Sequence, residues 1–424
     1  MKKLFTFFFL VLFAFSAWAQ GQSVSDQLKA DPRKAYGNDY PYQPFKGRLT
    51  KAPSGYKPFY ISHYSRHGSR YYWTGQLYTD LDKQLAAGHE KHVLTPRGEK
   101  LYNDFMAVKD ELNAGVGELT QLGWDQHQGI ARTMYGNFPE VFKKGGNEAI
   151  SSLNVRCVLS MSAFCQELVQ CNPKLEIREE SARHTLDGVV PTDRQNPVKH
   201  KVPRPKPRYE ANRERFFSIN TLPTDVARRI FSSTEDIPGE ERRIGENIIN
   251  LYKSLPNIGK EGMMDGIVTD EELARIWEAD NLGSYSWVFG PQYETVPVLE
   301  DILKKAEAVV SGKSDRVADL RFGHDTILGP LTVLMGINGA DRDPEDPSEV
   351  KNIYQNWETC KASNIQLVFY KSKKSPGDVL LKCLLNGQEA SLPVPTTMFP
   401  YYIWSDFRDF YTNRCNTIKN LPVE

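Results

Sequence analysis

Two short clusters of charged residues follow strand-like stretches of this sequence. The first, Arg66-His67-Gly68-Ser69-Arg70, comes directly after the aromatic and β-branched run 59–64, and we expect Gly68 to supply a chain reversal there. The second, His324-Asp325, follows the strand candidate 317–323. Ligands of open α/β sheets bind at the carboxyl ends of strands, so both clusters are candidates for a ligand site. A solvated charged turn is the alternative for the first cluster.

A third cationic group is predicted at the start of a helix. Arg156 lies in the first turn of a helix that we expect to open at Asn154. A cation in that turn opposes the helix dipole, which is unfavourable unless the site gathers anions. Free N–H groups and an arginine together make a good cradle for oxyanions.

These residue types suit the chemistry of phosphomonoesters. A phosphomonoester dianion needs fixed cations, a nucleophile in line with the departing oxygen, and an acid that protonates a poor alkoxide leaving group. Arg66, Arg70 and Arg156 can supply the cations. His67 can supply the nucleophile and Asp325 the acid.

The composition indicates a folded protein and gives little support to nucleic-acid binding. The chain has 424 residues, of which 40% are hydrophobic and 25% charged, as in an ordinary folded protein. Lys+Arg and Asp+Glu both number 53, so no global field attracts a nucleic acid, and we expect a small-molecule partner.

The amino terminus resembles a cleavable secretory signal. Lys2 and Lys3 precede the apolar stretch 4–15, and Ala17-Trp18-Ala19 follows it. We therefore expect residues 1–19 to be removed and the protein to be exported, either to a periplasm or outside the cell. The apolar stretch is too short for a comfortable membrane span, and no membrane anchor is predicted.

The six cysteines are an even number in a chain expected to be exported. They could form up to three disulfides, and buried free thiols are the equal alternative. They are Cys157, Cys165, Cys171, Cys360, Cys383 and Cys415.

The pattern along the chain predicts an α/β domain with a helical insertion. We expect the α/β domain to span 20–180 and 301–424. Its first part begins with a polar stretch over 21–56 that we expect to be an irregular surface arm. Strand and helix signals alternate after that stretch and return over 301–424. Between them, 181–300 lacks strand alternation. Helices are predicted there over 223–233, 238–254 and 269–279.

A basic, proline-broken segment lies at the start of that insertion. Residues 194–215 hold eight lysines and arginines against two glutamates. Contact with a phosphate-rich ligand is one interpretation, and a solvated linker is the other. The candidates for such a substrate rim are Lys199, Lys201, Arg204 and Lys206.

Several of these motifs together resemble one enzyme family, the histidine acid phosphatases, which form the second branch of the histidine phosphatase superfamily. The run Arg66-His67-Gly68-Ser69-Arg70 is similar to their phosphate-binding signature. The stretch 117–123 resembles their Gly-x-Leu-Thr-x-x-Gly motif. Arg156 with Ser160 and Ser162 resembles their arginine-bearing helix. His324-Asp325 resembles their proton-donor dipeptide.

The resemblance implies a mixed central sheet flanked by helices, a helical cap domain, and a two-step phosphatase that uses no metal or other cofactor. His67 would become phosphohistidine, and Asp325 would protonate the leaving oxygen. The groups that hold the phosphoryl oxygens would be Arg66, Arg70, Arg156 and His324. A monomer or weak dimer is expected.

The sequence features that bear on the substrate resemble two different subgroups of the family. The helix around 271–279 and the pair Arg70-Tyr71 resemble multiple inositol-polyphosphate phosphatases, and the basic segment suits phytate. That subgroup usually has His-Ala-Glu where this chain has His324-Asp325-Thr326, the pattern of bacterial and fungal phytases and general acid phosphatases. The alternatives are a broad-specificity acid phosphatase, a phosphotransferase, or a non-catalytic inositol-phosphate binding protein.

Overall fold

The computed structural model describes most of the chain. The described ranges are 23–143, 145–191, 203–218, 222–374 and 377–422. The signal-like residues 1–19, and with them Lys199 and Lys201, lie outside the described residues. Across those ranges, no helix combines the length and the apolar character needed to cross a membrane.

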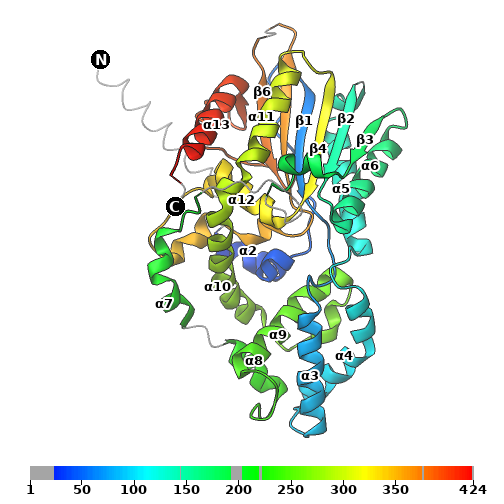
Figure 1. Ribbon diagram of the computed structural model, residues 1–424, viewed down its shortest axis with the longest axis vertical. Coiled ribbons are helices and arrows are strands. Elements are labelled where there is room, and N and C mark those ends of the chain that lie inside the picture. Colours follow the sequence, from blue (N-terminus) through cyan, green and yellow to red (C-terminus); the bar gives the residue numbers. More distant parts are fainter. Residues whose placement is uncertain (1–22, 144, 192–202, 219–221, 375–376, 423–424) are drawn as a thin grey trace, which may run out of the picture.

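In the described part of the chain, eight strands form one mixed sheet, which confirms the expected fold class (Figure 1). Their order is β3-β2-β4-β1-β5-β6-β7, and β8 pairs with β6. The strands are β1 (Tyr56–Arg66), β2 (Gly146–Ser151), β3 (Ile177–Glu180), β4 (Arg316–Gly323), β5 (Asn364–Ser372), β6 (Leu380–Leu385), β7 (Gln388–Glu389) and β8 (Tyr401–Ile403).

The central strand β1 runs parallel to β4 and antiparallel to β5. Arg66 is paired with Gly323, so β1 and β4 end at the same edge of the sheet. Side chains of a strand alternate between two faces, and β1 accordingly sends Ile61 into one core and Tyr60 and Tyr64 into the other. Burial on both faces explains the nearly continuous aromatic and β-branched run.

Helices cover both faces of the sheet (Figure 1). One face packs against α5 (Gln121–Asn137) and α6 (Val155–Cys171). The other face packs against α11 (Val296–Val310), α12 (Asp325–Met335) and α13 (Trp404–Lys419).

A second group of helices lies at the end of the sheet where β1 and β4 stop (Figure 1). The described part of 181–300 is mainly helical, and its helices pack with two helices from earlier in the chain: α3 contacts α9, and α4 contacts α8. The domain boundaries remain a prediction. The helices are α3 (Gln76–Glu90), α4 (Pro96–Ala114), α7 (Arg213–Ser218), α8 (Leu222–Ile230), α9 (Glu241–Ser254) and α10 (Asp270–Phe289).

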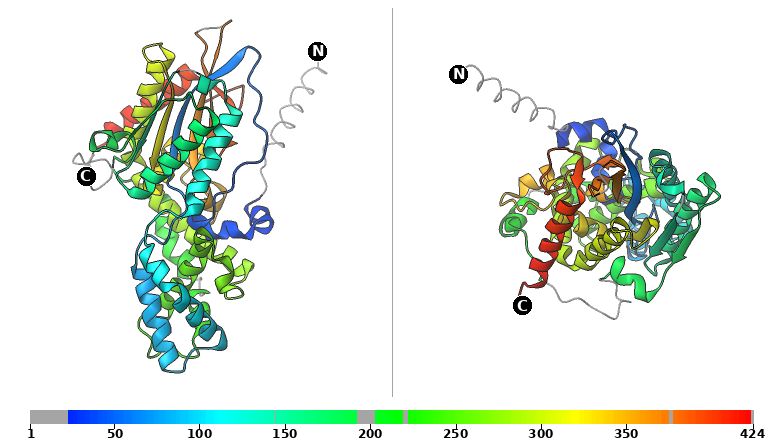
Figure 2. Two further views of the ribbon diagram at one scale, coloured as in Figure 1. Left: turned by 90° about the vertical axis from the view of Figure 1, so that its right-hand side faces the viewer. Right: turned by 90° about the horizontal axis from the view of Figure 1, so that it is seen from above.

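The amino-terminal stretch is ordered, so the prediction of an irregular arm over 21–56 was wrong in its first half. It forms helix α2 (Val24–Ala30) and a 3-10 helix, η1 (Pro32–Asp39), in which Ala35 is buried. The side chain of Asp31 caps η1 by accepting a hydrogen bond from the backbone N–H of Arg33. Figure 2 shows α2 at the junction between the sheet and the lower helices, and η1 packs against α10. The polar residues of this stretch were interpreted as a sign of a loop, whereas two of them, Ser23 and Asp31, cap the short helices α2 and η1.

All six cysteines lie within the described residues, and none forms a disulfide; five of them are buried. The alternative of buried thiols without disulfides is therefore the one that the structure shows.

Two histidines are buried in the core beneath the charged loop. His63 stacks on Phe164 at 5.0 Å between ring centroids, and both His63 and His127 pack against Phe322. Neither ring nitrogen of His63 has a hydrogen-bond partner in the described chain. Burial in this apolar layer lowers the pKa of each imidazole to about 3.

These histidines should make the fold less stable in acid. Between pH 6.5 and about 3 the unfolded chain binds protons that the folded chain does not, so each histidine lowers the free energy of unfolding by about 1.4 kcal/mol per pH unit as pH falls. His63→Phe, which preserves the aromatic stack, should reduce the slope by about that amount in urea unfolding at pH 4, 5 and 6. His184→Phe, at an exposed site, is the control. An unchanged slope in His63→Phe would contradict this account.

Candidate active site

The loop after β1 is held between two other segments by backbone hydrogen bonds. The N–H of His67 donates to the carbonyl of Gly323 at the end of β4, at 2.9 Å. The N–H of Ala362 donates to the carbonyl of His67, and that of Arg66 to the carbonyl of Ser363, each also at 2.9 Å. The loop is therefore fixed on both sides, as a preorganised site requires.

Glycines allow this loop to lie directly against the start of α5. A Cβ atom on Gly68 would come within 2.3 Å of the carbonyl oxygen of Gly123, and a Cβ on Gly123 within 2.2 Å of that of Ser69. Thr120 caps α5 and donates from its hydroxyl to the Ser69 carbonyl at 3.0 Å. The φ of Gly68 is not positive, so close approach and not the predicted chain reversal requires glycine here.

His67 is buried and is oriented by one hydrogen bond. Its Nδ1 lies 2.9 Å from the carbonyl oxygen of Gly68. A carbonyl only accepts, so Nδ1 carries the proton and Nε2 keeps a free lone pair. Burial first, and then the nearby cations Arg70 and Arg66, hold the pKa of His67 well below its usual 6.5. The imidazole is therefore neutral even in mild acid, and a neutral imidazole with an available lone pair can act as a nucleophile.

Three arginines surround this imidazole. Each uses one Nη atom to anchor itself, as when Arg66 donates to the Thr359 carbonyl at 2.7 Å and Arg156 to Asn154 Oδ1 at 2.9 Å. Each also has a buried Nε with no partner among the described residues. Burial and the neighbouring Arg66 lower the pKa of Arg70 to about 10, which leaves it charged below that pH. Buried N–H donors without partners indicate a site built for an anion.

The second predicted cluster faces the first. His324 is the cap residue of α12, and its ring centroid lies 5.6 Å from that of His67. Asp325 begins α12, and its Oδ2 forms a 2.8 Å ion pair with Nη2 of Arg66. Burial alone would raise the pKa of Asp325, but Arg66, Arg70 and His324 together hold it below its usual value. The carboxylate is therefore ionised when the site holds no ligand.

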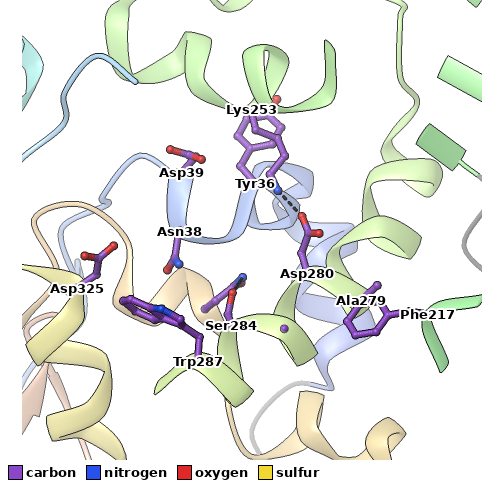
Figure 3. Close-up of a pocket in the computed structure, with 12 residues that line it drawn as sticks. Tyr36, Asn38, Asp39, Phe217, Lys253, Ala279, Asp280, Ser284, Trp287 and Asp325 are labelled. Atoms are coloured by element: carbon purple, nitrogen blue, oxygen red, sulfur yellow. Dashed lines mark hydrogen bonds and ion pairs between the residues drawn. The ribbon is translucent and has the colours of Figure 1, made fainter. Parts of the chain in front are cut away.

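A pocket of about 500 Å³ opens beside Asp325 (Figure 3). Two ion pairs lie at it: Lys253 bonds to Asp280, and Lys361 bonds to Asp39. The exposed Trp287 of α10 forms part of its wall. Sequence reasoning missed these five residues because none belongs to a recognisable motif.

The structure brings six predicted site residues together and places elsewhere the two substrate-rim candidates that it describes, Arg204 and Lys206. Arg204 is exposed and pairs with Glu294, and Lys206 is also exposed. Neither lines the pocket beside Asp325. The six residues at the sheet edge are Arg66, His67, Arg70, Arg156, His324 and Asp325.

Comparisons with known proteins identify the fold. No family model and no curated protein matches the sequence. A multiple inositol polyphosphate phosphatase from Bifidobacterium longum, solved with phosphate, matches with a TM-score of 0.68 at 18% identity, covering 89% of this chain and 97% of that one. The phytase from D. castellii matches with a TM-score of 0.67 at 16% identity, covering 90% and 85%. At these identities the likeness shows a shared fold, that of the histidine acid phosphatases, as the sequence motifs implied.

The contact between Gly68 and Gly123 gives a direct test of how the site is held. Gly123→Ala should push the loop away from α5 and weaken the binding of inorganic phosphate at least tenfold in calorimetry. Gly129→Ala is the matched control, because a Cβ there meets nothing within 4 Å and helix propensity favours alanine. Equal phosphate affinity in the two variants would contradict the proposed role of this contact.

Proposed function

We propose that this protein is a phosphomonoester hydrolase that acts on inositol phosphates through a phosphohistidine intermediate. The observation that carries the proposal is the neutral imidazole of His67, with Nε2 free, among three arginines whose Nε–H groups have no partner in the described chain. Solved relatives of the same fold are named as inositol polyphosphate phosphatases and phytases, which supports the substrate class.

In the first step the phosphoryl oxygens are held by the groups at the sheet edge, namely Arg66, Arg70, Arg156 and His324. Nε2 of His67 attacks phosphorus, an N–P bond forms and the ester P–O bond breaks. Asp325 gives its proton to the departing oxygen, so an alcohol leaves instead of an alkoxide. The arginines stabilise the charge that gathers on the three equatorial oxygens.

In the second step water attacks the phosphorus of phosphohistidine. Asp325, now a carboxylate, accepts a proton from that water, and the N–P bond breaks. Inorganic phosphate leaves, and His67 returns to its neutral form with the proton still on Nδ1. If an alcohol replaced water here, the same site would act as a phosphotransferase.

The charges at the site favour catalysis at acidic pH. Asp325 is ionised in the empty site because the arginines lower its pKa. An arriving phosphate dianion offsets those cations, which raises the pKa of the carboxyl and favours the acid form. His67 stays neutral in acid because its own pKa is low. We therefore expect an acidic optimum.

The intermediate can be trapped. Rapid quenching with labelled substrate should give an adduct on His67 that is stable in base and labile in acid, and His67→Ala should lose the adduct and at least a thousandfold in kcat. His89→Ala, at a surface ion pair, is the control. Tight phosphate binding with neither turnover nor adduct would instead indicate a non-catalytic binding protein.

Asp325→Asn tests the general acid. Its kcat/KM, which reports the phosphorylation of His67 and not the shared dephosphorylation step, should fall by about 10²–10⁴-fold on an alkyl phosphate but by much less on p-nitrophenyl phosphate, whose phenolate leaves without a proton. The fall in wild-type kcat above neutral pH should be flattened in the variant. Asp406→Asn, in the exposed first turn of α13, is the control. A wild-type rate that rises steadily to pH 9, or equal losses on both substrates, would argue against this role.

A further inference from the structure

The pocket beside Asp325 is lined by Lys253 and by two carboxylates, Asp39 and Asp280, each of which pairs with a lysine (Figure 3). The side chain of Lys253 is 10% exposed and that of its partner Asp280 is 40% exposed. Lys361 is 2% exposed, whereas its partner Asp39 is 25% exposed. In both ion pairs the ammonium group is buried and the carboxylate is the more accessible partner.

This arrangement opposes the binding of further phosphate groups. Burial raises the pKa of Asp39, but Lys361 and Lys253 lower it more, so the carboxylate stays ionised in mild acid. A second phosphate placed in the pocket would meet two carboxylates whose lysines are already paired. Like charges brought together in a partly desolvated pocket cost affinity, and breaking an ion pair to free its lysine costs more.

The remaining lining suits hydroxyl groups and a ring. Carboxylates accept hydrogen bonds from hydroxyls. Ser284 accepts a hydrogen bond from Asn356 at 3.0 Å and can still donate its own proton. Trp287 is 47% exposed and offers a flat apolar surface against which the C–H face of a ring can pack. A volume of about 500 Å³ accommodates a six-membered ring.

We propose that this pocket selects a six-membered polyol ring bearing one or two phosphates, and that Asp39 and Asp280 act as specificity residues against highly phosphorylated rings. The proposal rests on the proposed function and narrows its substrate class. The phosphate to be cleaved occupies the arginine cradle, and the free hydroxyls of the ring face the carboxylates.

The test compares kcat/KM for myo-inositol 1-phosphate with that for myo-inositol hexakisphosphate. We expect the wild-type ratio to be at least ten in favour of the monophosphate. Asp280→Asn should lower that ratio at least fivefold, mainly by raising kcat/KM for the hexakisphosphate, and Asp39→Asn tests the second ion pair independently.

Glu278→Gln is the matched control for Asp280→Asn. It removes one negative charge from the same helix, but Glu278 pairs with Lys351 outside this pocket, so the ratio should stay within twofold of wild type. A wild-type preference for the hexakisphosphate would overturn the proposal. So would equal ratios in the Asp280→Asn and Glu278→Gln variants.

Failure of the proposed function gives a different result. In that case neither inositol phosphate nor p-nitrophenyl phosphate releases phosphate, and no phosphohistidine forms. Selectivity is then measured as binding of the same two inositol phosphates by calorimetry. Tighter binding of the hexakisphosphate would overturn the proposed selectivity on its own.

Discussion

The concentration of positive charge around one neutral imidazole is the constraint on which this structure depends. Three arginines, of which Arg66 is buried and Arg70 and Arg156 are half-buried, repel one another, and their removal from water makes that repulsion expensive. Within the described site, Asp325 offsets part of it through its ion pair with Arg66. In the proposed mechanism a phosphate dianion offsets more, and Asp325 can then take up a proton. The same electrostatic imbalance would thus provide both affinity for phosphate and protonation of the proposed general acid.

Such an imbalance persists only where the backbone cannot relax. Parallel pairing of β1 with β4 fixes His67 beside the start of α12, and the contact between Gly68 and Gly123 presses the loop against α5. The apolar layer containing His63 and His127 lies beneath it. This support carries a cost in acid, because the two histidines favour the unfolded chain at the pH where the proposed chemistry works best.

Local signals in the sequence were sufficient to predict which residues gather around His67 at the edge of the sheet. A β-branched and aromatic run predicts β1, and the polar residues after it and after β4 share one sheet edge. The pocket could not be predicted in the same way, because Asp39 meets Lys361 across 322 positions of sequence. The amino-terminal helix η1, which ends at Asp39, also depends on packing against α10. Helix ends were less predictable: α10 was expected over 269–279 and runs to Phe289.

Charge composition alone does not show which charges a ligand meets, because charged side chains pair with one another. The basic segment suggested a polyanion, and that interpretation stays a prediction. Among its described residues, Arg204, Arg208 and Arg213 already pair with glutamates. At the pocket each lysine is less exposed than the carboxylate with which it pairs. A ligand therefore meets negative charge there, although the sequence supplies as many lysines as carboxylates to these two ion pairs. If the proposals hold, a site for one phosphate adjoins a pocket that disfavours the next. The proposed chemistry then resides in the arginines and His67, and the proposed selectivity depends on which partner of each ion pair faces the ligand.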